Sequence, residues 1–472
     1  MLSASPVAEN FGSLLEATAR RQPRNPALVW DGGALTWEEL DRRAGGFSRA
    51  LAGLGVTSGD RIALSIPNRW SFVVALLGGL KAGATVVPLN PLLTADERAR
   101  ILAHLGSALL VESVGADEAE RQSQPAAGPA LILYTSGSTG QPKGAVLSHA
   151  ALGFSSHSWA GPVMALTTED RVLAALPFSH SYGLNGALLA PLLAGATVVL
   201  LERFSPEEAL GAVARHRVTV FPGVATMFRR LLDAPALDAA DLSSLRLALS
   251  GAAPCPWELA QEWRRRTGVR ILRGYGMTEL FRPISYLAAD PTDLPDAIGR
   301  PVPGVEVRVV DEDGRALPAG ETGELWIKSP AAMDGYLDAP EESRAVLADG
   351  WFKTGDLVTV SPDGFVRIAG RKRELILRGG YSVFPGEVEG ALLTHPAVAE
   401  AAVIGVSHAE LGEEVIAFAT LRVGSTARPD ELIAHCKARL AAYKYPRRVV
   451  IVDHLPKSAT GKVQKSRLAT SP

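Results

Sequence analysis

Cysteine is scarce in this chain of 472 residues, which contains only Cys255 and Cys436. Two cysteines so far apart form neither a disulfide framework nor the spacing of a metal site, so we interpret both as packing residues in a reducing compartment. An excess of charge of one sign is missing too, because 48 Lys and Arg residues face 50 Asp and Glu residues. This balance argues against nucleic acid or an anionic membrane surface as a partner.

A long apolar run is also absent. Residues 1–26 lack a basic segment followed by an apolar core, so export is not expected. The nearest approach to a membrane span, Gly186–Leu201, is too short and contains Pro191 and Gly195. A buried helix followed by a buried strand explains it better, so the sequence predicts a cytoplasmic protein without a transmembrane segment.

The segment Gly186–Leu201 has a twin at Ala75–Leu89, and both contain the phrase Ala-Gly-Ala-Thr-Val-Val. Each copy is followed by the pattern of a capping box, Thr94–Glu97 and Ser205–Glu208, which would open the next helix. Chance similarity between two examples of a common helix-glycine-strand pattern is one explanation. We favour a repeat, because apolar strand-like runs alternate with helical patterns as parallel sheets require. Those runs are Arg61–Ser65, Arg217–Phe221 and Leu245–Leu249.

The later chain changes character. From Gly304 to Val366, short alternating strands and turns predict a small β subdomain. The charged cluster Gly370–Glu374 follows, and it is either a solvated loop or a hinge between domains. The fold class predicted is α/β: a large N-terminal domain of two pseudo-repeated α/β layers plus a small β subdomain, then a small, mobile α+β C-terminal domain. The predicted boundaries are 1–370 for the N-terminal domain (layers to about 300, β subdomain about 301–370), 371–373 for the hinge and 374–472 for the C-terminal lid.

One loop combines hydroxyls, glycines and a lysine directly after the apolar run Ala130–Leu133. It reads Tyr134-Thr-Ser-Gly-Ser-Thr-Gly-Gln-Pro-Lys-Gly144. Backbone N–H groups, hydroxyls and the ammonium of Lys143 together favour a phosphate cradle, although a Ser/Gly-rich loop can also be a flexible connector. It is not a G-x-x-x-x-G-K-[ST] loop, because Gly144 stands where a metal-binding hydroxyl would follow the lysine. The metal ligand must therefore lie elsewhere.

Arg273–Glu279 is the second cluster. The ring of Tyr275 could stack on a base, the hydroxyl of Thr278 could reach a phosphate, and Glu279 could supply the hard oxygen that Mg²⁺ requires. A capped turn without a ligand is the structural alternative.

Two further motifs follow. In Gly350–Leu357, Asp356 comes just after a glycine turn and could accept both hydroxyls of a ribose, although an ordinary β-turn would look the same. In Leu455–Lys465, the ammonium of Lys462 could be projected from a terminal segment into a cleft. Most lysines near a chain terminus only aid solubility. A functional role for Lys462 is therefore supported only by the other motifs in the chain.

With these motifs in place, the chain resembles the adenylate-forming superfamily, which contains acyl-CoA synthetases, peptide-synthetase adenylation domains and luciferases. The resemblance covers nearly the whole chain and keeps the order of the family's motifs. The matching segments are Tyr134–Gly144, Leu176–Tyr182, Ser250–Ala253, Gly274–Glu279, Gly350–Leu357, Gly370–Glu389 and Lys457–Lys462.

The resemblance implies an ATP-dependent carboxylate–CoA ligase that uses Mg²⁺. The carboxylate would attack the α-phosphate of ATP to give an acyl-adenylate and pyrophosphate, and the thiol of coenzyme A would then displace AMP. Alternatives are a stand-alone enzyme that loads a separate carrier protein, a phosphotransferase, and a catalytically silent nucleotide-binding protein. A dimer is the expected oligomer, if one forms.

The resemblance also assigns roles. Lys462 would bridge the carboxylate and the α-phosphate, Thr278 would contact that phosphate, and Glu279 would hold Mg²⁺. The residues implied to bind ATP or AMP are Thr135, Ser136, Gly137, Ser138, Thr139, Gly140, Lys143, Gly251, Ala252, Ala253, Gly274, Tyr275, Gly276, Met277, Asp356 and Arg371.

For the second half-reaction, Arg373 stands at the family's hinge position, where Asp or Lys is usual. Gly379, Gly380 and Tyr381 would line the path of the thiol. The implied acyl pocket is apolar, and His180 within it could equally be a neutral packing residue. Its members are Phe178, His180, Phe221, Met227, Met277 and Leu280. Arg282 is unusual beside them: pointing inward it could clamp a second carboxylate, but it could also face solvent or a salt bridge.

Overall fold

The structure is a computed structural model that describes residues 10–106, 108–115, 117–136, 142–290, 293–379, 381–408, 410–457 and 463–468. The chain divides into two compact units, Met1–Glu306 with Lys328–Phe352, and Val307–Ile327 with Lys353–Pro472. The predicted α/β fold class is confirmed. The division groups much of the small β region with the C-terminal residues, and the hinge at 371–373 stays a prediction.

The first unit contains a nine-stranded sheet in the order β14-β13-β12-β11-β10-β8-β9-β1-β2. From β1 to β12 neighbouring strands run parallel, while β2, β13 and β14 are antiparallel additions at the two edges. The strands are β1 (Pro26–Trp30), β2 (Gly33–Thr36), β8 (Arg171–Ala174), β9 (Thr197–Leu200), β10 (Val220–Gly223), β11 (Leu247–Ser250), β12 (Ile271–Met277), β13 (Phe281–Ser285) and β14 (Arg300–Pro301).

A second sheet in this unit has six strands in the order β17-β7-β6-β4-β3-β5. Its strands β3, β4, β5 and β6 are parallel, and β7 and β17 continue it antiparallel. They are β3 (Arg61–Leu64), β4 (Thr85–Pro88), β5 (Ala108–Val111), β6 (Leu131–Ser136), β7 (Pro142–Leu147) and β17 (Gly335–Tyr336).

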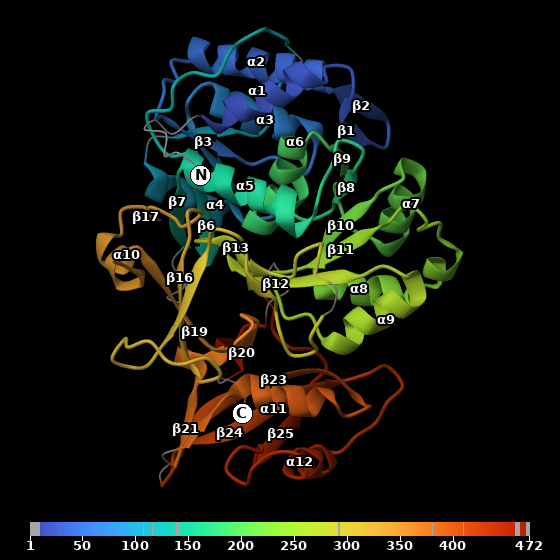
Figure 1. Ribbon diagram of the computed structural model, residues 1–472, viewed down its shortest axis with the longest axis vertical. Helices are drawn as coiled ribbons and strands as arrows, with labels where there is room; N and C mark the ends of the chain where they lie inside the picture. Colours follow the sequence, from blue (N-terminus) through green and yellow to red (C-terminus); the bar gives the residue numbers. More distant parts are fainter. Residues whose placement is uncertain are drawn as a thin grey trace. The chain divides into compact units, whose positions relative to one another are not determined.

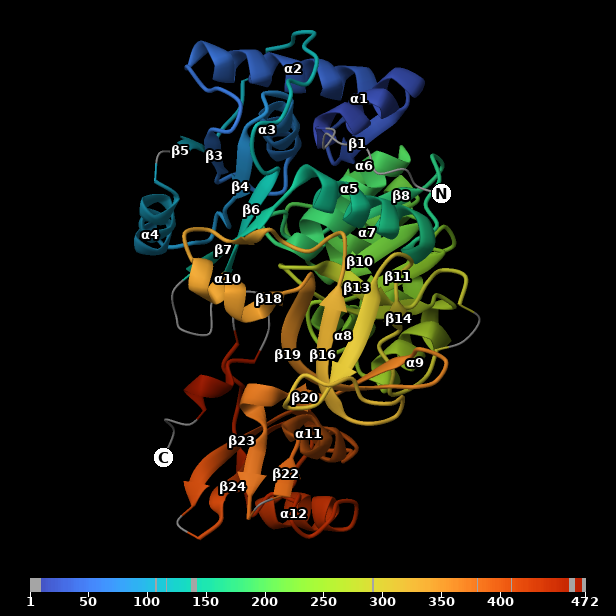
Figure 2. The same cartoon turned by 60° about the vertical axis from the view of Figure 1, so that its left-hand side comes forward.

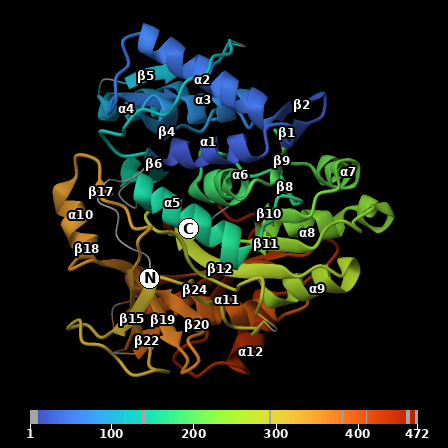
Figure 3. The same cartoon turned by 45° about the horizontal axis from the view of Figure 1, so that its top comes forward.

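Helices pack on both sheets. Figure 1 shows α1, α2 and α3 grouped together, and Figure 3 shows α8 and α9 side by side next to β11 and β12. The helices of this unit are α1 (Phe11–Arg21), α2 (Trp37–Gly53), α3 (Trp70–Lys81), α4 (Ala95–Leu105), α5 (His149–Ser158), α6 (Ala190–Ala194), α7 (Pro206–His216), α8 (Ala225–Asp233), α9 (Trp257–Thr267) and α10 (Pro340–Val346), with π-helical turns at Trp159–Val163 and Tyr182–Leu189. In the part of the chain that the structure describes, none of the helices combines the length and the hydrophobicity that a membrane span requires.

The internal repeat is visible in three dimensions. Helix α3 leads through Gly83 into β4 of one sheet, and α6 leads through Gly195 into β9 of the other. Both glycines have a positive φ, 74° and 80°, the conformation that lets the chain leave a helix and enter a strand. Thr94 forms the full capping box with Glu97, whereas Ser205 only accepts the N–H of Glu208.

Two predicted strands begin later than their apolar residues indicate: the run Leu245–Leu249 becomes strand only from Leu247, and the run Arg217–Phe221 only from Val220. The pattern of Arg217–Phe221 predicts an extended segment, but Arg217 has φ 49° and ends α7 in the left-handed conformation. Strand β10 therefore starts only at Val220. Helix α7 ends at His216, and the left-handed C-cap at Arg217 redirects the chain, so the ladder pairing begins only after Val218 and Thr219.

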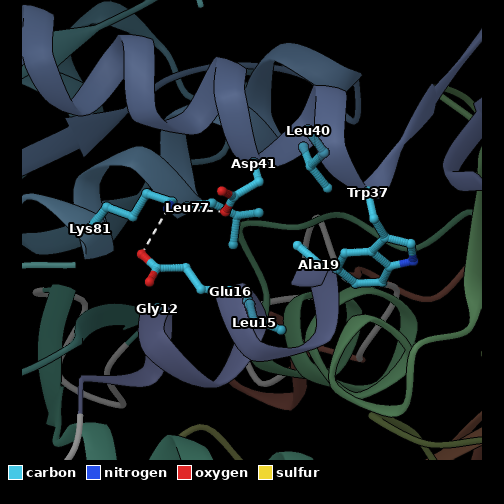
Figure 4. Close-up of a pocket in the computed structure, with 9 residues that line it drawn as sticks. All are labelled: Gly12, Leu15, Glu16, Ala19, Trp37, Leu40, Asp41, Leu77 and Lys81. Carbon is cyan, nitrogen blue, oxygen red and sulfur yellow. Dashed lines mark hydrogen bonds and ion pairs between the residues drawn. The ribbon is translucent and has the colours of Figure 1, made fainter. Parts of the chain in front are cut away.

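The layer of α1, α2 and α3 surrounds a buried ion cluster. The side chain of Lys81 is 3% exposed, and its Nζ lies 2.7 Å from Glu16 Oε1 and 2.9 Å from Asp41 Oδ1. Figure 4 shows the three side chains pointing toward one another beside a cavity of about 10 Å³. Burial raises the pKa of the Asp41 carboxyl, while the ammonium of Lys81 opposes that rise. Pairing compensates the cost of placing these charges away from water.

The irregular segment 117–129 crosses α2 and is tied to this layer. Ala119 N donates to Arg42 O, and Lys81 Nζ donates to Arg121 O at 2.9 Å. The crossing needs glycine, because a Cβ at Gly45 would lie 2.0 Å from Ala119 O and one at Gly46 would lie 2.1 Å from Asp117 O.

The second unit holds most of one sheet and all of another. In the first of these, β15 (Glu306–Val310), β16 (Gly323–Lys328), β19 (Trp351–Val360) and β18 (Leu347–Ala348) follow in that order, and β20 (Val366–Arg371) pairs with β19. Figure 2 shows β16 beside β19.

The other sheet has the order β22-β21-β24-β23, with β25 beside β24. It packs with α11 and α12 around a core that includes the buried Cys436, as expected for a packing residue. Its elements are β21 (Ile376–Arg378), β22 (Tyr381–Val383), β23 (Val398–His408), β24 (Gly412–Leu421), β25 (Arg448–Ile451), α11 (Pro385–Leu393) and α12 (Pro429–Lys437).

Candidate active site

The carboxyl ends of β8, β10, β11 and β12 carry most of the predicted site residues of the first unit. His180 follows β8, Phe221 lies in β10, Gly251 follows β11, and Thr278 follows β12. Because parallel strands end at the same edge of a sheet, residues far apart in the chain gather there. The edge of the nine-stranded sheet is therefore the candidate active site.

The described residues of the predicted phosphate-binding motif lie on two antiparallel neighbours, β6 and β7. The register pairs Thr135 with Lys143 and Ser136 with Pro142, so two predicted phosphate-binding residues are direct cross-strand neighbours. Gly137, Ser138, Thr139 and Gly140 lie outside the described residues. The side chain of Ser136 is likewise not described.

Lys143 and Glu279 come together through Tyr336, a residue that the sequence reasoning missed. Lys143 Nζ lies 5.4 Å from the centre of the Tyr336 ring and 3.6 Å from Glu342 Oε1. The hydroxyl of Tyr336 donates to Glu279 Oε1 at 2.8 Å. Burial, followed by the charge of Glu279, raises the pKa of Tyr336, so the phenol stays protonated. No local sequence pattern around Gly335-Tyr336 predicts the hydrogen bond between Tyr336 and Glu279.

Glu279 stands in the tight turn between β12 and β13. Leu280 N donates to Met277 O at 3.2 Å, and Met333 N donates to Glu279 O at 2.9 Å, so the backbone of the glutamate is fixed. Among the described residues no group of three metal-ligating side chains occurs. A single fixed carboxylate fits Mg²⁺, which usually takes one or two carboxylates together with the phosphates of its substrate.

Within the strip Gly251–Ala253, Gly251 is buried, Ala252 is exposed and Ala253 is half-buried. Ala252 has φ 64°, a left-handed conformation that costs a residue with a Cβ about 1–2 kcal/mol. A Cβ at Gly251 would lie 3.1 Å from the ring of Tyr182, whose hydroxyl donates to Leu249 O at 3.0 Å. Strained backbone of this kind is concentrated at binding sites in proteins.

Arg282 points inward behind this strip and is 5% exposed. Its Nε donates to Ser285 Oγ at 3.0 Å, and its terminal nitrogens donate to Ser250 O and Leu272 O at 3.3 Å. Its Cζ lies 4.9 Å from the centre of the Trp159 ring. No carboxylate of the described residues pairs with it, and burial lowers its pKa. The guanidinium thus ties β11, β12 and β13 together, and its role toward a second carboxylate stays a prediction.

Three of the residues predicted to line an acyl pocket are buried apolar side chains. Phe178 and Phe221 are each 1% exposed, and Met227 is 7% exposed. Asn68, also missed from the sequence, holds the segment before His180: its Nδ2 donates to Leu176 O at 2.7 Å, and its Oδ1 accepts the Phe178 N–H at 3.0 Å.

His180 behaves as a neutral side chain. Its Nδ1 accepts the N–H of Tyr182 at 3.2 Å, and burial lowers its pKa. The sheet edge also contains Met277 and Leu280, which is buried.

The remaining predicted residues belong to the second unit. Asp356 in β19 lies across from Arg371 in β20, and Arg371 Nε is 3.0 Å from Asp356 Oδ1. Gly379, with φ 57°, begins the turn between β21 and β22, and Tyr381 stacks on Tyr443 with ring centres 4.6 Å apart.

Three of these predictions cannot be compared with side-chain positions. Arg373 lies in the short 3₁₀ turn Lys372–Glu374, and its side chain is not described. Gly380 and Lys462 lie outside the described residues.

Comparison with known proteins identifies the family. The model of the AMP-binding enzyme family matches residues 15–128 and 112–337, and that of the AMP-binding enzyme C-terminal domain matches residues 387–462. A feruloyl-CoA synthase from Amycolatopsis sp is 37% identical over 98% of each chain. A long-chain-fatty-acid–CoA ligase from Yersinia pestis is 32% identical over 98% of this chain and 94% of its own.

Among solved structures, the ATP-bound MatB from Rhodopseudomonas palustris matches with a TM-score of 0.89 and 33% identity, covering 97% of this chain and 98% of its own. The chain therefore belongs to the AMP-binding enzymes, the adenylate-forming superfamily, as an acyl-CoA synthetase or ligase.

Proposed function

We propose that this ligase works in two steps at the edge of the nine-stranded sheet. A carboxylate is a poor acyl donor, because its charge repels nucleophiles and oxide is a hopeless leaving group. Its oxygen would attack the α-phosphorus of ATP, the bond to the β-phosphate oxygen would break, and pyrophosphate would leave. The sulfur of coenzyme A would then attack the acyl carbon, AMP would leave, and the thiol proton would pass to solvent.

The observation that carries the proposal is the contact chain from Lys143 through Tyr336 to Glu279. A cation suited to phosphate oxygens and a carboxylate suited to Mg²⁺ are thereby held within one assembly, as phosphoryl chemistry requires. When bound, Mg²⁺ would neutralise part of the phosphate charge. The Thr135–Lys143 pair would hold the pyrophosphate side of ATP, and Thr278 would bind the α-phosphate.

The purine and the ribose would be bound by different elements. Gly251, Ala252 and Ala253 would lie against one side of the adenine, with Tyr275 at the other. Asp356, oriented by Arg371, would accept hydrogen bonds from the ribose hydroxyls.

The acid is proposed to be apolar, because Phe178, Phe221 and Met227 are buried together at the sheet edge. Two of the related enzymes act, by their names, on ferulate and on long-chain fatty acids. We therefore infer an aromatic or fatty acid, and a neutral His180 is compatible with either.

The test is a screen for pyrophosphate release with short, medium, long, aryl and dicarboxylic acids, followed by product analysis. We expect AMP, pyrophosphate and an acyl-CoA thioester from a subset of apolar acids. Release of ADP would contradict the mechanism. Thioester on an added carrier protein but not on free coenzyme A would favour the carrier-loading alternative, and nucleotide binding without turnover of any acid would favour a silent binding protein.

Different single substitutions should impair adenylation and thioester formation separately. Lys462→Ala should slow acyl-adenylate formation by about 100- to 1000-fold, because a cation at the reaction centre is lost, and leave thioester formation from supplied acyl-adenylate largely intact. Gly380→Leu should do the reverse by obstructing the thiol path. Equal losses of both half-reactions in each variant would contradict this division.

A further inference from the structure

Tyr336 lies on β17, the strand that pairs with β7 and therefore runs next to Lys143. Strand β17 pairs with β7 so that Tyr336 lies across from Ala145, and Leu337 N donates to Gly144 O at 2.8 Å. Lys143 is two residues before Ala145, and residues two apart on a strand point to the same face. The pairing therefore brings the ring of Tyr336 beside the ammonium of Lys143, at 5.4 Å.

The segment that carries Tyr336 also holds Glu279 at two points. Met333 N donates to the main-chain oxygen of Glu279 at 2.9 Å, and the Tyr336 hydroxyl donates to Oε1 at 2.8 Å. No other described residue makes a side-chain hydrogen bond to this carboxylate. One oxygen is thus engaged and oriented, which leaves Oε2 available for a cation.

Tyr336 is in turn fixed by helix α10. Its N–H donates to Ser343 Oγ at 2.8 Å, and that hydroxyl donates to Ala339 O at 2.7 Å. The same helix supplies Glu342, whose Oε1 lies 3.6 Å from Lys143 Nζ. Side chain and backbone of Tyr336 are therefore both constrained, so the phenol can act as a rigid spacer.

We propose that Tyr336 is a positioning residue for adenylation, whose hydroxyl aims the Glu279 carboxylate at Mg²⁺ and whose ring face holds Lys143 toward the phosphates. The proposal rests on the proposed function. A hydrogen bond to a charged group is among the stronger ones in proteins, and a carboxylate with one oxygen fixed loses less freedom when it takes a metal. The cation over the ring restricts Lys143 in the same way.

Two substitutions separate the hydroxyl from the ring. Tyr336→Phe removes only the hydrogen bond to Glu279, and Tyr336→Leu removes the aromatic face under Lys143 as well. ATP binding to the full-length protein is measured by titration calorimetry with and without Mg²⁺, and pyrophosphate release is measured as a function of Mg²⁺ concentration.

For Tyr336→Phe we expect the Mg²⁺ concentration that gives half-maximal rate to rise about tenfold, with metal-free ATP affinity unchanged. For Tyr336→Leu we expect the same rise and, in addition, about threefold weaker metal-free binding of ATP. Unchanged Mg²⁺ dependence in both variants would overturn the proposal. So would an equal loss of ATP affinity with and without the metal in Tyr336→Phe, since that is the signature of a merely structural tyrosine.

Tyr445→Phe is the matched control, because no hydrogen bond of that hydroxyl to a described residue occurs, and its ring contacts Arg447 in the second unit. It should reproduce the wild-type titrations. If the unaltered protein itself shows no Mg²⁺-dependent ATP binding and no pyrophosphate release, the proposed function fails. If the unaltered protein is active and both Tyr336 variants match it, only the present inference fails.

Discussion

Two regions of the first unit bury a cation in opposite ways. In the helical layer, Lys81 is surrounded by the carboxylates of Glu16 and Asp41. At the sheet edge, Arg282 is equally buried but meets backbone carbonyls, a serine and the face of Trp159. The first arrangement is neutralised and serves stability, while the second leaves positive charge behind the strip that is proposed to bind the anionic nucleotide.

The largest effect is expected from Lys81→Met. It leaves the buried Glu16 and the half-buried Asp41 without their counter-charge, which should lower the free energy of unfolding by about 3–5 kcal/mol. Urea unfolding of the variant measures this. The exposed Lys437→Met is the control, and a loss as small as that of the control would show that the paired region does not depend on its charges.

His149 represents a third solution, because it is buried but neutral. Its Nδ1 accepts the Phe11 N–H at 3.1 Å, and burial lowers its pKa from 6.5 to about 4. Between pH 6.5 and pH 4 the imidazole of His149 is protonated in the unfolded chain but not in the folded chain. The contribution of the neutral imidazole to the free energy of unfolding is therefore fully present above pH 6.5 and is lost as the pH falls to 4. The loss is about 3 kcal/mol.

Urea midpoints of the wild type and of His149→Gln between pH 4 and 7 measure this dependence. Glutamine retains an acceptor for Phe11 N–H but cannot titrate in this range. The variant should show a shallower pH dependence, and identical profiles would contradict the assignment.

Arg282→Lys should have an intermediate effect, because lysine keeps the charge but cannot hold Ser250 O, Leu272 O and Ser285 at once. A loss of about 2 kcal/mol in unfolding free energy is expected. The exposed Arg265→Lys should be neutral within about 0.5 kcal/mol. If Arg282→Lys were neutral too, charge rather than geometry would explain why this arginine is buried.

The smallest effect concerns the strained backbone of the same edge. Ala252→Gly should raise the unfolding free energy by about 0.5–1 kcal/mol, because glycine adopts φ 64° without the Cβ clash. Ala253→Gly, next along the chain, should lower it instead. A destabilised Ala252→Gly would mean that the sheet edge does not store strain at this residue.

Sequence reasoning located elements with strong local signals. Short sequence patterns predict the twin segments, the glycines that follow α3 and α6, and the parallel strands. Each of these features is found in the structure. Tyr336 and Asn68 could not be found this way, because their partners Glu279 and Phe178 lie far away in the chain and neither residue type specifies a long-range hydrogen bond. The inward direction of Arg282 likewise depends on tertiary packing.

The passage of segment 117–129 over α2 has a consequence for how such contacts evolve. The main chain of the segment packs directly on the helix at Gly45 and Gly46, beside the ion pairs of Glu118 with Arg42 and Arg43. A contact of this sort survives almost any change of sequence in the crossing segment itself, provided that the two helical positions stay bare. Its only lasting trace in a divergent descendant would be a helix that tolerates two residues with poor helical propensity.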